Sequence, residues 1–176
     1  MHVFVYSRAQ KVTLELNGKM IGEQVVQPNT ITVQFDVPYE PGMLIAKSYN
    51  DGKQTGADTL STVGKPVALR LSADRNTIKA DRNDLSYVHV EVVDAEENVV
   101  PYVDDLLVKY NVQGNGEIAG VGNGNPEDVS SFQQPEKKVF HGRGLVIVRP
   151  KGSAGKITLK AVAEGLKGAQ IVITTR

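Results

Sequence analysis

The chain lacks cysteine and tryptophan, and it carries no excess of charge of either sign. Among its 176 residues, 20 basic side chains balance 20 acidic ones. Without cysteine the chain can form no disulfide, no thiolate zinc site and no cysteine nucleophile. A chain without net charge has no general electrostatic attraction to nucleic acid or to an anionic membrane. We therefore expect neither nucleic acid nor a membrane as a partner.

The sequence also has no long hydrophobic segment. Its apolar runs cover only a few residues, whereas a membrane-spanning helix needs about 20. The opening stretch Met1–Tyr6 has neither the basic region nor the small-residue cleavage site of a signal peptide. Because a strand pattern begins directly at Met1, we expect the chain to be a piece of a longer protein.

Apolar and polar residues alternate along most of the chain, and no segment shows a helical stripe. This alternation predicts an all-β fold, with strands such as Val12–Leu16 and Ile31–Phe35. Asn17–Gly18 and Asp51–Gly52 stand where type I′ hairpin turns are expected. Pro38–Pro41 is expected to form a turn between two strands.

A short segment, Ser61–Pro66, separates two blocks of strands and predicts a domain boundary. The first domain, residues 1–64, is expected to be a small immunoglobulin-like β-sandwich of about five or six strands. The second, residues 65–176, has about seven strand patterns at the spacing of an immunoglobulin-like sandwich. The sequence thus predicts two tandem immunoglobulin-like β-sandwiches.

One glycine-rich stretch, Gly114–Gly142, contains only Glu117–Ala119 as a predicted strand. A loop of this length is either functional or packed down as an Ω-type loop. Its glycines would let backbone amides approach a phosphate, but no helix pattern follows at Asn125–Asp128. Tight turns are therefore favoured over nucleotide binding.

Carboxylates cluster in four places, and each cluster is a conceivable calcium site. The clusters are Asp81/Asp84, Asp94/Glu96/Glu97, Asp104/Asp105 and Glu127/Asp128. None follows the twelve-residue acidic loop with a central glycine that calcium prefers. For residues 94–98, which lie between two valine-rich strands, a solvated hairpin turn is favoured.

The histidines do not form a metal or catalytic pattern. His2, His89 and His141 lie in three separate segments, and His89 is expected to face away from the core. No zinc-binding spacing of histidines is present, and no serine stands in a nucleophile elbow. The sequence predicts no catalytic, cofactor-binding or metal-binding residue, and no cofactor.

Sugar-binding faces normally use exposed flat aromatic side chains, with tryptophan the strongest choice. Phe4, Phe35 and Tyr110 are expected in the core, and Tyr39 in the proline-bracketed turn. The remaining candidate platforms are Tyr49, Tyr87 and Tyr102. Packing in or beside the core is favoured for them, and the missing tryptophan argues against sugar binding.

Several stretches nevertheless resemble a known family. Val5–Ser7, Val12–Lys19 and Val37–Ala46 are similar to the small β-sandwich that follows the catalytic barrel in bacterial glycoside hydrolase family 2 enzymes of the β-galactosidase type. The second block resembles the carboxy-terminal domain of the same enzymes, which is itself similar to invasin-type immunoglobulin-like repeats. The stretches that carry this second resemblance are Leu69–Arg75, Ile78–Asp81, Val88–Asp94, Ile118–Pro126 and Gly142–Arg149.

The resemblance implies a parent enzyme that is a periplasmic or exported bacterial β-galactosidase or a close relative. Such enzymes retain anomeric configuration through two glutamates in a (β/α)₈ barrel. That barrel needs about 250 residues, so it does not fit in this chain, and none of the family's catalytic motifs is present. We therefore expect an accessory region, inactive alone, whose partner is the catalytic barrel of the same parent chain.

Exposed apolar surface on the first block would then be a domain interface. Two other hypotheses stay open at this point. One makes the chain a carbohydrate-binding module that tethers the enzyme to polysaccharide. The other makes it an adhesin-type stalk, which should show further tandem copies.

Overall fold

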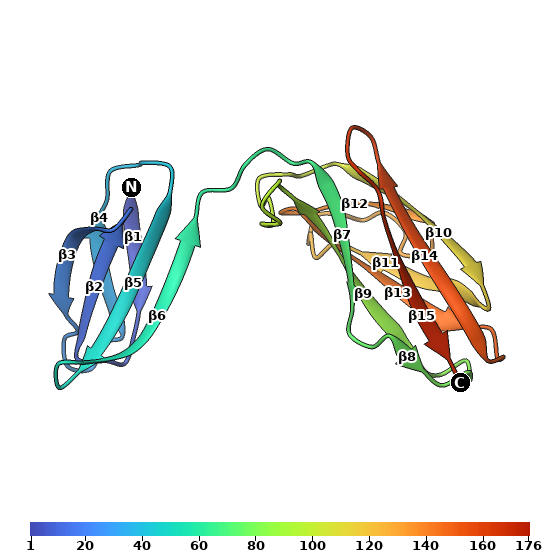
Figure 1. Ribbon diagram of the computed structural model, residues 1–176, viewed down its shortest axis with the longest axis horizontal. Helices are drawn as coiled ribbons and strands as arrows, with labels where there is room; N and C mark the ends of the chain where they lie inside the picture. The colour runs from blue at the N-terminus through green and yellow to red at the C-terminus, as the bar shows by residue number, and fades with distance from the viewer. The chain divides into compact units, whose positions relative to one another are not determined.

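The computed structural model describes residues 1–176 and consists of fifteen strands joined by turns and loops, with no helix (Figure 1). The predicted all-β fold is confirmed. None of its elements is a helix that could cross a membrane. The chain divides into two compact units, Met1–Thr62 and Val63–Arg176. The domain limits expected from the sequence, residues 1–64 and 65–176, stay a prediction.

The first unit contains two sheets of unequal size. Strands β1 and β4 form a two-stranded sheet, and the other four strands form a sheet in the order β3-β2-β5-β6. The strands are β1 His2–Tyr6, β2 Lys11–Leu16, β3 Lys19–Val25, β4 Thr32–Asp36, β5 Met43–Asn50 and β6 Lys53–Ser61. The core lies between the two sheets and consists mainly of Val12, Leu14, Leu16, Val33, Phe35, Val37 and Leu44.

Both predicted hairpins of the first unit are confirmed. Asn17 and Gly18, between β2 and β3, have φ angles of 52° and 78°. Asp51 and Gly52, between β5 and β6, have φ angles of 50° and 75°. Positive φ at both central residues is the property that selects Asn-Gly and Asp-Gly for these turns. The turns fix which side chains of β2 and β5 face the core.

The second unit is built from a five-stranded sheet, β12-β10-β14-β15-β8, and a four-stranded sheet, β11-β13-β9-β7. The strands are β7 Ala68–Ala73, β8 Thr77–Ile78, β9 Ser86–Val93, β10 Leu107–Gly114, β11 Gly116–Gly122, β12 Glu136–Lys138, β13 Arg143–Pro150, β14 Gly155–Ala163 and β15 Ala169–Thr175. The sequence pattern predicted fewer strands because β8 and β12 are only two and three residues long. Such short segments show no readable alternation.

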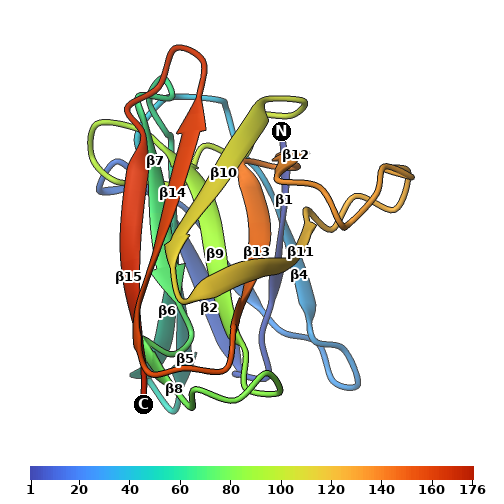
Figure 2. The same cartoon turned by 90° about the vertical axis from the view of Figure 1, so that its right-hand side faces the viewer.

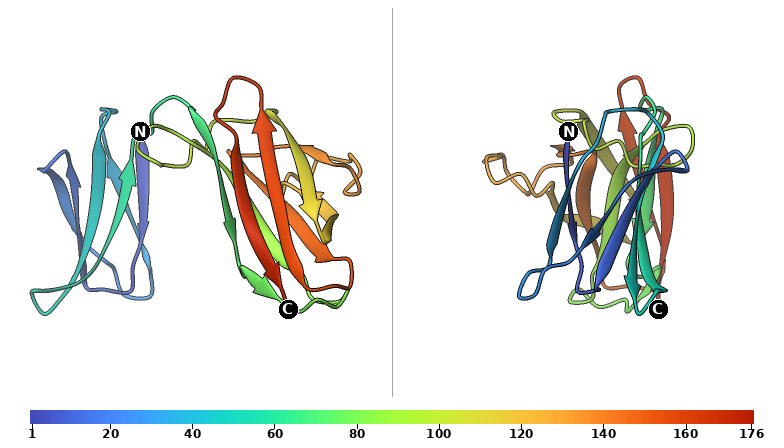
Figure 3. Two further views of the ribbon diagram at one scale, coloured as in Figure 1. Left: turned by 45° about the vertical axis from the view of Figure 1, so that its right-hand side comes forward. Right: turned by 90° about the vertical axis from the view of Figure 1, so that its left-hand side faces the viewer.

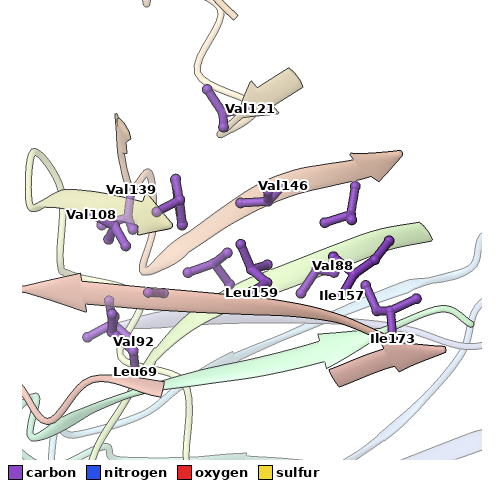
Figure 4. Close-up of a cluster of buried hydrophobic side chains, with 14 of the residues drawn as sticks. Leu69, Val88, Val92, Val108, Val121, Val139, Val146, Ile157, Leu159 and Ile173 are labelled. Carbon is purple, nitrogen blue, oxygen red and sulfur yellow. The ribbon is translucent and has the colours of Figure 1, made fainter. Parts of the chain in front are cut away.

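The core of the second unit follows the alternation seen in the sequence. In β9, Val88, Val90 and Val92 are fully buried, whereas His89 is exposed, as expected. In Figure 4, Val88 lies beside Ile157 of the facing sheet, and all three valines belong to one core cluster with Ile157 and Leu159. Gly116 of β11 lies against Ile157, and a Cβ atom on Gly116 would come within 2.6 Å of the isoleucine side chain.

The glycine-rich stretch Gly114–Gly142 is more regular than its sequence indicates. Two strands, β11 and β12, occupy parts of it, so that residues 123–135 are its longest segment without regular structure. The expectation of tight turns throughout is wrong for Gly120 and Gly122, which lie within β11 and outside the left-handed region. It holds for Gly114, whose φ angle is 88°.

Candidate functional site

The aromatic residues of the first unit are not placed entirely as expected. Phe35 is buried as predicted, but Phe4 is 54% exposed, so its assignment to the core is wrong. The physical reason is the period of a strand: Val3 and Val5 of β1 turn toward the core, and Phe4 between them must therefore point away from it. Tyr6 shares this outer side and is 70% exposed.

The course of β1, which starts at the amino terminus, and of the β5–β6 hairpin can be followed in Figure 3. A groove of about 240 Å³ lies in the first unit, between β1 and the inner face of β5 and β6. We refer to it as the β1–β6 groove. Its floor and walls include Val3, Val5, Leu14, Leu44, Ala46 and Leu60. A second hollow of about 200 Å³ starts at Val5 and Tyr6 and extends toward Gly56. The first unit therefore has an open apolar flank along these two strands.

The groove is open because the two layers of the first unit differ in width. One layer has two strands and the other has four, and neighbouring strands are about 4.8 Å apart. Since β4 lies against β3, the narrow layer covers only one side of the wide one. Strand β6 is left without a covering layer, and all nine of its residues are exposed. Leu60, which neighbours buried Leu44 on β5, is itself 65% exposed.

Charge in the β1–β6 groove is limited to one side chain, the carboxylate of Asp58. On β5, Lys47 forms an ion pair with Glu15 of β2, with 2.6 Å between Nζ and Oε1. The hydrogen bond to Glu15 raises the pKa of Lys47 above its usual value. The side chains of Lys47 and Glu15 lie on the opposite face of the sheet from Leu14 and Ala46, outside the groove. The groove itself presents an apolar surface with a single acidic group at its β6 side.

In the second unit, residues 123–135 form a loop that projects from the body of the sandwich (Figure 2). A buried cation, Lys137 of β12, anchors this loop. Its Nζ lies 3.0 Å from Asp128 Oδ2 and donates hydrogen bonds to the Ser130 hydroxyl and carbonyl oxygens, at 2.7 and 3.1 Å. The same ammonium lies 4.8 Å from the centre of the Phe132 ring. These contacts fasten the projecting loop to β12 through residues 128–132.

The Asp128 carboxylate completes this anchor. Hydrogen bonds from Ser130, together with Lys137, hold the pKa of Asp128 well below its usual range. The carboxylate consequently stays ionised throughout the physiological pH range, and the ion pair with Lys137 persists. At the outer end of the loop, Val129 is 97% exposed.

Several backbone amides of this loop are engaged within the loop itself. Four of them donate to side chains two residues earlier in the chain: Asn125 to Asn123, Glu127 to Asn125, Ser130 to Asp128 and Gln133 to Ser131. A phosphate cradle needs several amides that point together toward one ligand. The structure therefore gives no support to nucleotide binding at the glycine-rich segment.

The acidic clusters serve the fold. Asp94 accepts hydrogen bonds from the amides of Gly64, Glu96 and Asn98, and the Gly64 amide makes the largest contribution to lowering its pKa. These bonds close the turn at residues 94–98, as the sequence predicts. Asp84 binds Arg75 and the Lys79 amide. The structure contains no group of three or more His, Asp or Glu side chains arranged to hold a metal ion.

The remaining histidines and tyrosines have separate local partners within their own units. His2 contacts Asp36 in the first unit, and His141 contacts Asp104 in the second. Tyr110 is buried as expected, and burial raises the pKa of its hydroxyl, which has no hydrogen-bond partner. Tyr102 is exposed, and its hydroxyl donates to the Gly64 carbonyl.

Of the surfaces described here, the β1–β6 groove is the strongest candidate for a functional site. Sequence reasoning expected exposed apolar surface on the first block to be an interface, but it did not locate the surface. The sequence feature that bears on its location is the number of strands in the first block. The pairing of only two strands in one layer, which leaves β6 uncovered, is visible in the structure alone.

Two family models match the chain. Residues 69–172 match the glycoside hydrolase family 2 C-terminal domain 5, and residues 1–56 match a domain of unknown function, DUF4982. The first match covers nearly the whole second unit. The second falls within the unit that carries the β1–β6 groove.

Curated relatives are longer than this chain. A protein named Beta-galactosidase BoGH2A, from Bacteroides ovatus, is 39% identical over 169 residues, which are 96% of this chain and 20% of that protein. A putative beta-glucuronidase from Formosa agariphila is 30% identical over 152 residues, which are 84% of this chain and 14% of that protein. The chain thus spans about a fifth or less of the length of these relatives.

Solved structures, too, match this chain over only a fraction of their own length. A glycosyl hydrolase family 2 member from Bacteroides cellulosilyticus superimposes with a TM-score of 0.95 at 40% identity, over 99% of this chain and 24% of the other. A beta-glucuronidase of glycoside hydrolase family 2 superimposes with a TM-score of 0.92 at 26% identity, over 99% of this chain and 18% of the other. In both cases the match includes the two units together.

Proposed function

The chain belongs to the glycoside hydrolase family 2 C-terminal domains, and from this premise we propose that it is a non-catalytic accessory region of a larger family 2 enzyme. In this role its first unit packs against another part of the same enzyme, the catalytic barrel. The observation that carries the proposal is the β1–β6 groove, an open apolar surface on a chain that spans about a fifth of its relatives. Exposed apolar surfaces of this kind mark interaction sites.

The proposal extends to the chemistry of the parent enzyme. We propose a β-galactosidase, because the 39%-identical relative bears that name. Beta-glucuronidases also occur among the relatives, so the parent enzyme should be assayed on both aryl β-galactosides and aryl β-glucuronides. Faster turnover of the galactoside supports the proposal, and exclusive turnover of the glucuronide contradicts it. The sugar-binding and stalk hypotheses, and the likeness to invasin repeats, stay untested predictions.

Docking through the β1–β6 groove can be tested with Leu60→Asp in the parent enzyme. Full burial of a leucine side chain contributes about 1.5–3 kcal/mol, and a buried unpaired carboxylate is unfavourable. We expect the variant to lower the free energy of unfolding of the first unit by about 2 kcal/mol in the parent enzyme, measured by urea denaturation. The 176-residue chain alone should be unaffected, because Leu60 is exposed there.

The matched control is Val129→Asp, at an exposed apolar residue of the second unit. It should leave the stability of the first unit unchanged both in the parent enzyme and in the chain alone. An equal response of the chain and the parent enzyme to Leu60→Asp would contradict docking at this groove.

A further inference from the structure

The outer edge of β1 carries unpaired main-chain groups. Met1 and Val37 exchange both of their main-chain hydrogen bonds, and the Ser7 amide donates to the Ile31 carbonyl. In an antiparallel pair, hydrogen-bonded and non-bonded residues alternate. The odd-numbered residues of β1 therefore bond to β4, and the amides and carbonyls of Phe4 and Tyr6 point away from it. Strand β1 has no second neighbour, so this edge is free.

The free edge of β1 stands beside the β1–β6 groove. Val3 and Val5 of β1 line the groove together with Leu44, and Leu60 lines it from β6. A strand added next to β1 would extend the two-stranded layer by about 4.8 Å, toward the uncovered strand β6. Its inward side chains would then cover Leu60. One added strand would satisfy the edge of β1 and close the apolar flank at once.

We infer that the β1–β6 groove accepts an extended segment that pairs with the free edge of β1 as a third strand of that sheet. The occupant is a segment from the remainder of the family 2 polypeptide, and this inference rests on the function proposed above. Its relatives have about four-fifths of their length outside the matched region, so covalently attached chain is present at high effective concentration. Strand addition of this kind gives affinity through main-chain hydrogen bonds and specificity through alternate side chains.

The residues that line the groove also indicate which side chains the added segment should carry. Apolar residues surround one carboxylate, Asp58. The segment should therefore have alternating apolar side chains on its inner side, with a basic side chain within reach of Asp58. A second copy of the chain would be a different occupant, and the test below separates the two.

A pair of substitutions at Tyr6 distinguishes main-chain pairing from side-chain contact. Tyr6→Pro removes the free amide, whereas Tyr6→Ala removes the same aromatic ring and keeps the amide. Neither change breaks the ladder with β4, because the Tyr6 amide faces away from it. The rate of proteolytic cleavage within the first unit, which follows the population of its open form, is measured for both variants in the parent enzyme and in the chain alone.

We expect the Pro variant to be cleaved about two- to tenfold faster than the Ala variant in the parent enzyme, the effect of one lost hydrogen bond. In the chain alone the two rates should differ by a smaller factor that does not depend on concentration. Equal Pro-to-Ala ratios in the parent enzyme and the chain would overturn strand addition. A ratio that grows with the concentration of the isolated chain would also overturn it, in favour of pairing between copies.

The outcome for Leu60→Asp separates this inference from the proposed function. If Leu60→Asp destabilises the first unit in the parent enzyme but the two Tyr6 variants behave alike, docking stands and strand pairing fails. If Leu60→Asp has no specific effect in the parent enzyme, docking itself fails and strand pairing fails with it.

Discussion

Replacing Ile157 by alanine is expected to lower the free energy of unfolding of the second unit by about 4 kcal/mol, within the range for large-to-small changes at buried sites. Ile157 of β14 is fully buried, and its side chain lies against the backbone of Gly116 in the facing sheet. The change removes buried apolar surface and leaves a cavity that rigid strands on both sides cannot close. Urea denaturation followed by methyl NMR signals of the second unit measures the loss.

A second substitution tests whether this packing is the cause. Gly116→Ala alone should destabilise the second unit by about 1–3 kcal/mol, because the added methyl would lie 2.6 Å from Ile157. In the Ile157→Ala background the same methyl enters the cavity, so the double variant should be more stable than the two separate losses indicate. If the two losses of stability are strictly additive, the contact between residues 116 and 157 does not determine the loss caused by Gly116→Ala.

Replacing Gly142 by alanine is expected to cost about 3 kcal/mol of stability in the second unit. Gly142 has a φ angle of 69°, and a Cβ atom there would lie 2.3 Å from the carbonyl oxygen of Val100. Because that atom belongs to the backbone, it cannot move aside as a flexible side chain could. Thermal or urea unfolding gives the loss directly.

Gly124→Ala is the matched control for this substitution. Gly124 also has a positive φ angle, 77°, but no atom lies within 4 Å of the position that its Cβ would take. Only the backbone strain of a left-handed alanine remains, which costs about 1 kcal/mol. Equal losses for the two variants would mean that the approach of Val100 has no effect on stability.

The sequence predicted best those features that local chemistry determines. The Asn17–Gly18 and Asp51–Gly52 turns require two positive φ angles, and few other residue pairs supply them. The alternation of Val88, Val90 and Val92 with polar or exposed neighbours determined the inner face of β9. The all-β fold followed from such patterns.

The misassignments arose where tertiary contacts decide the outcome. Gly120 and Gly122 were expected in turns, yet the loop covers them: the Phe132 ring lies near Gly122, and the Phe132 carbonyl accepts a hydrogen bond from Val121. The Lys137 anchor left no signal either, because a lysine between polar neighbours indicates an exposed position. Only its contacts with Asp128 and Ser130 make its burial tolerable.

The sequence predicted that the first block carries an interface, but it did not predict where on the block the interface lies. An interface on the first block was expected, but Phe4 was assigned to the core instead of to the outer side of β1. Alternation alone could have corrected this, since Val3 and Val5 already occupy the inner side. The mismatch between a two-stranded and a four-stranded layer depends on strand pairing over long distances in sequence, which periodicity does not reveal.

The β1–β6 groove is expected to be covered when the chain is part of its parent enzyme. The chain has no cysteine of its own, so Leu60→Cys introduces a single thiol at the groove, and Val129→Cys introduces one at an exposed reference position. The rate of alkylation at each thiol, followed by peptide mass spectrometry, reports the exposure of that position. We predict that Cys at position 60 is alkylated at least about tenfold more slowly in the parent enzyme than in the isolated chain, because reaction then requires local opening. Position 129 should react at similar rates in both. Equal rates at position 60 in the two proteins would mean that the β1–β6 groove stays uncovered in the parent enzyme.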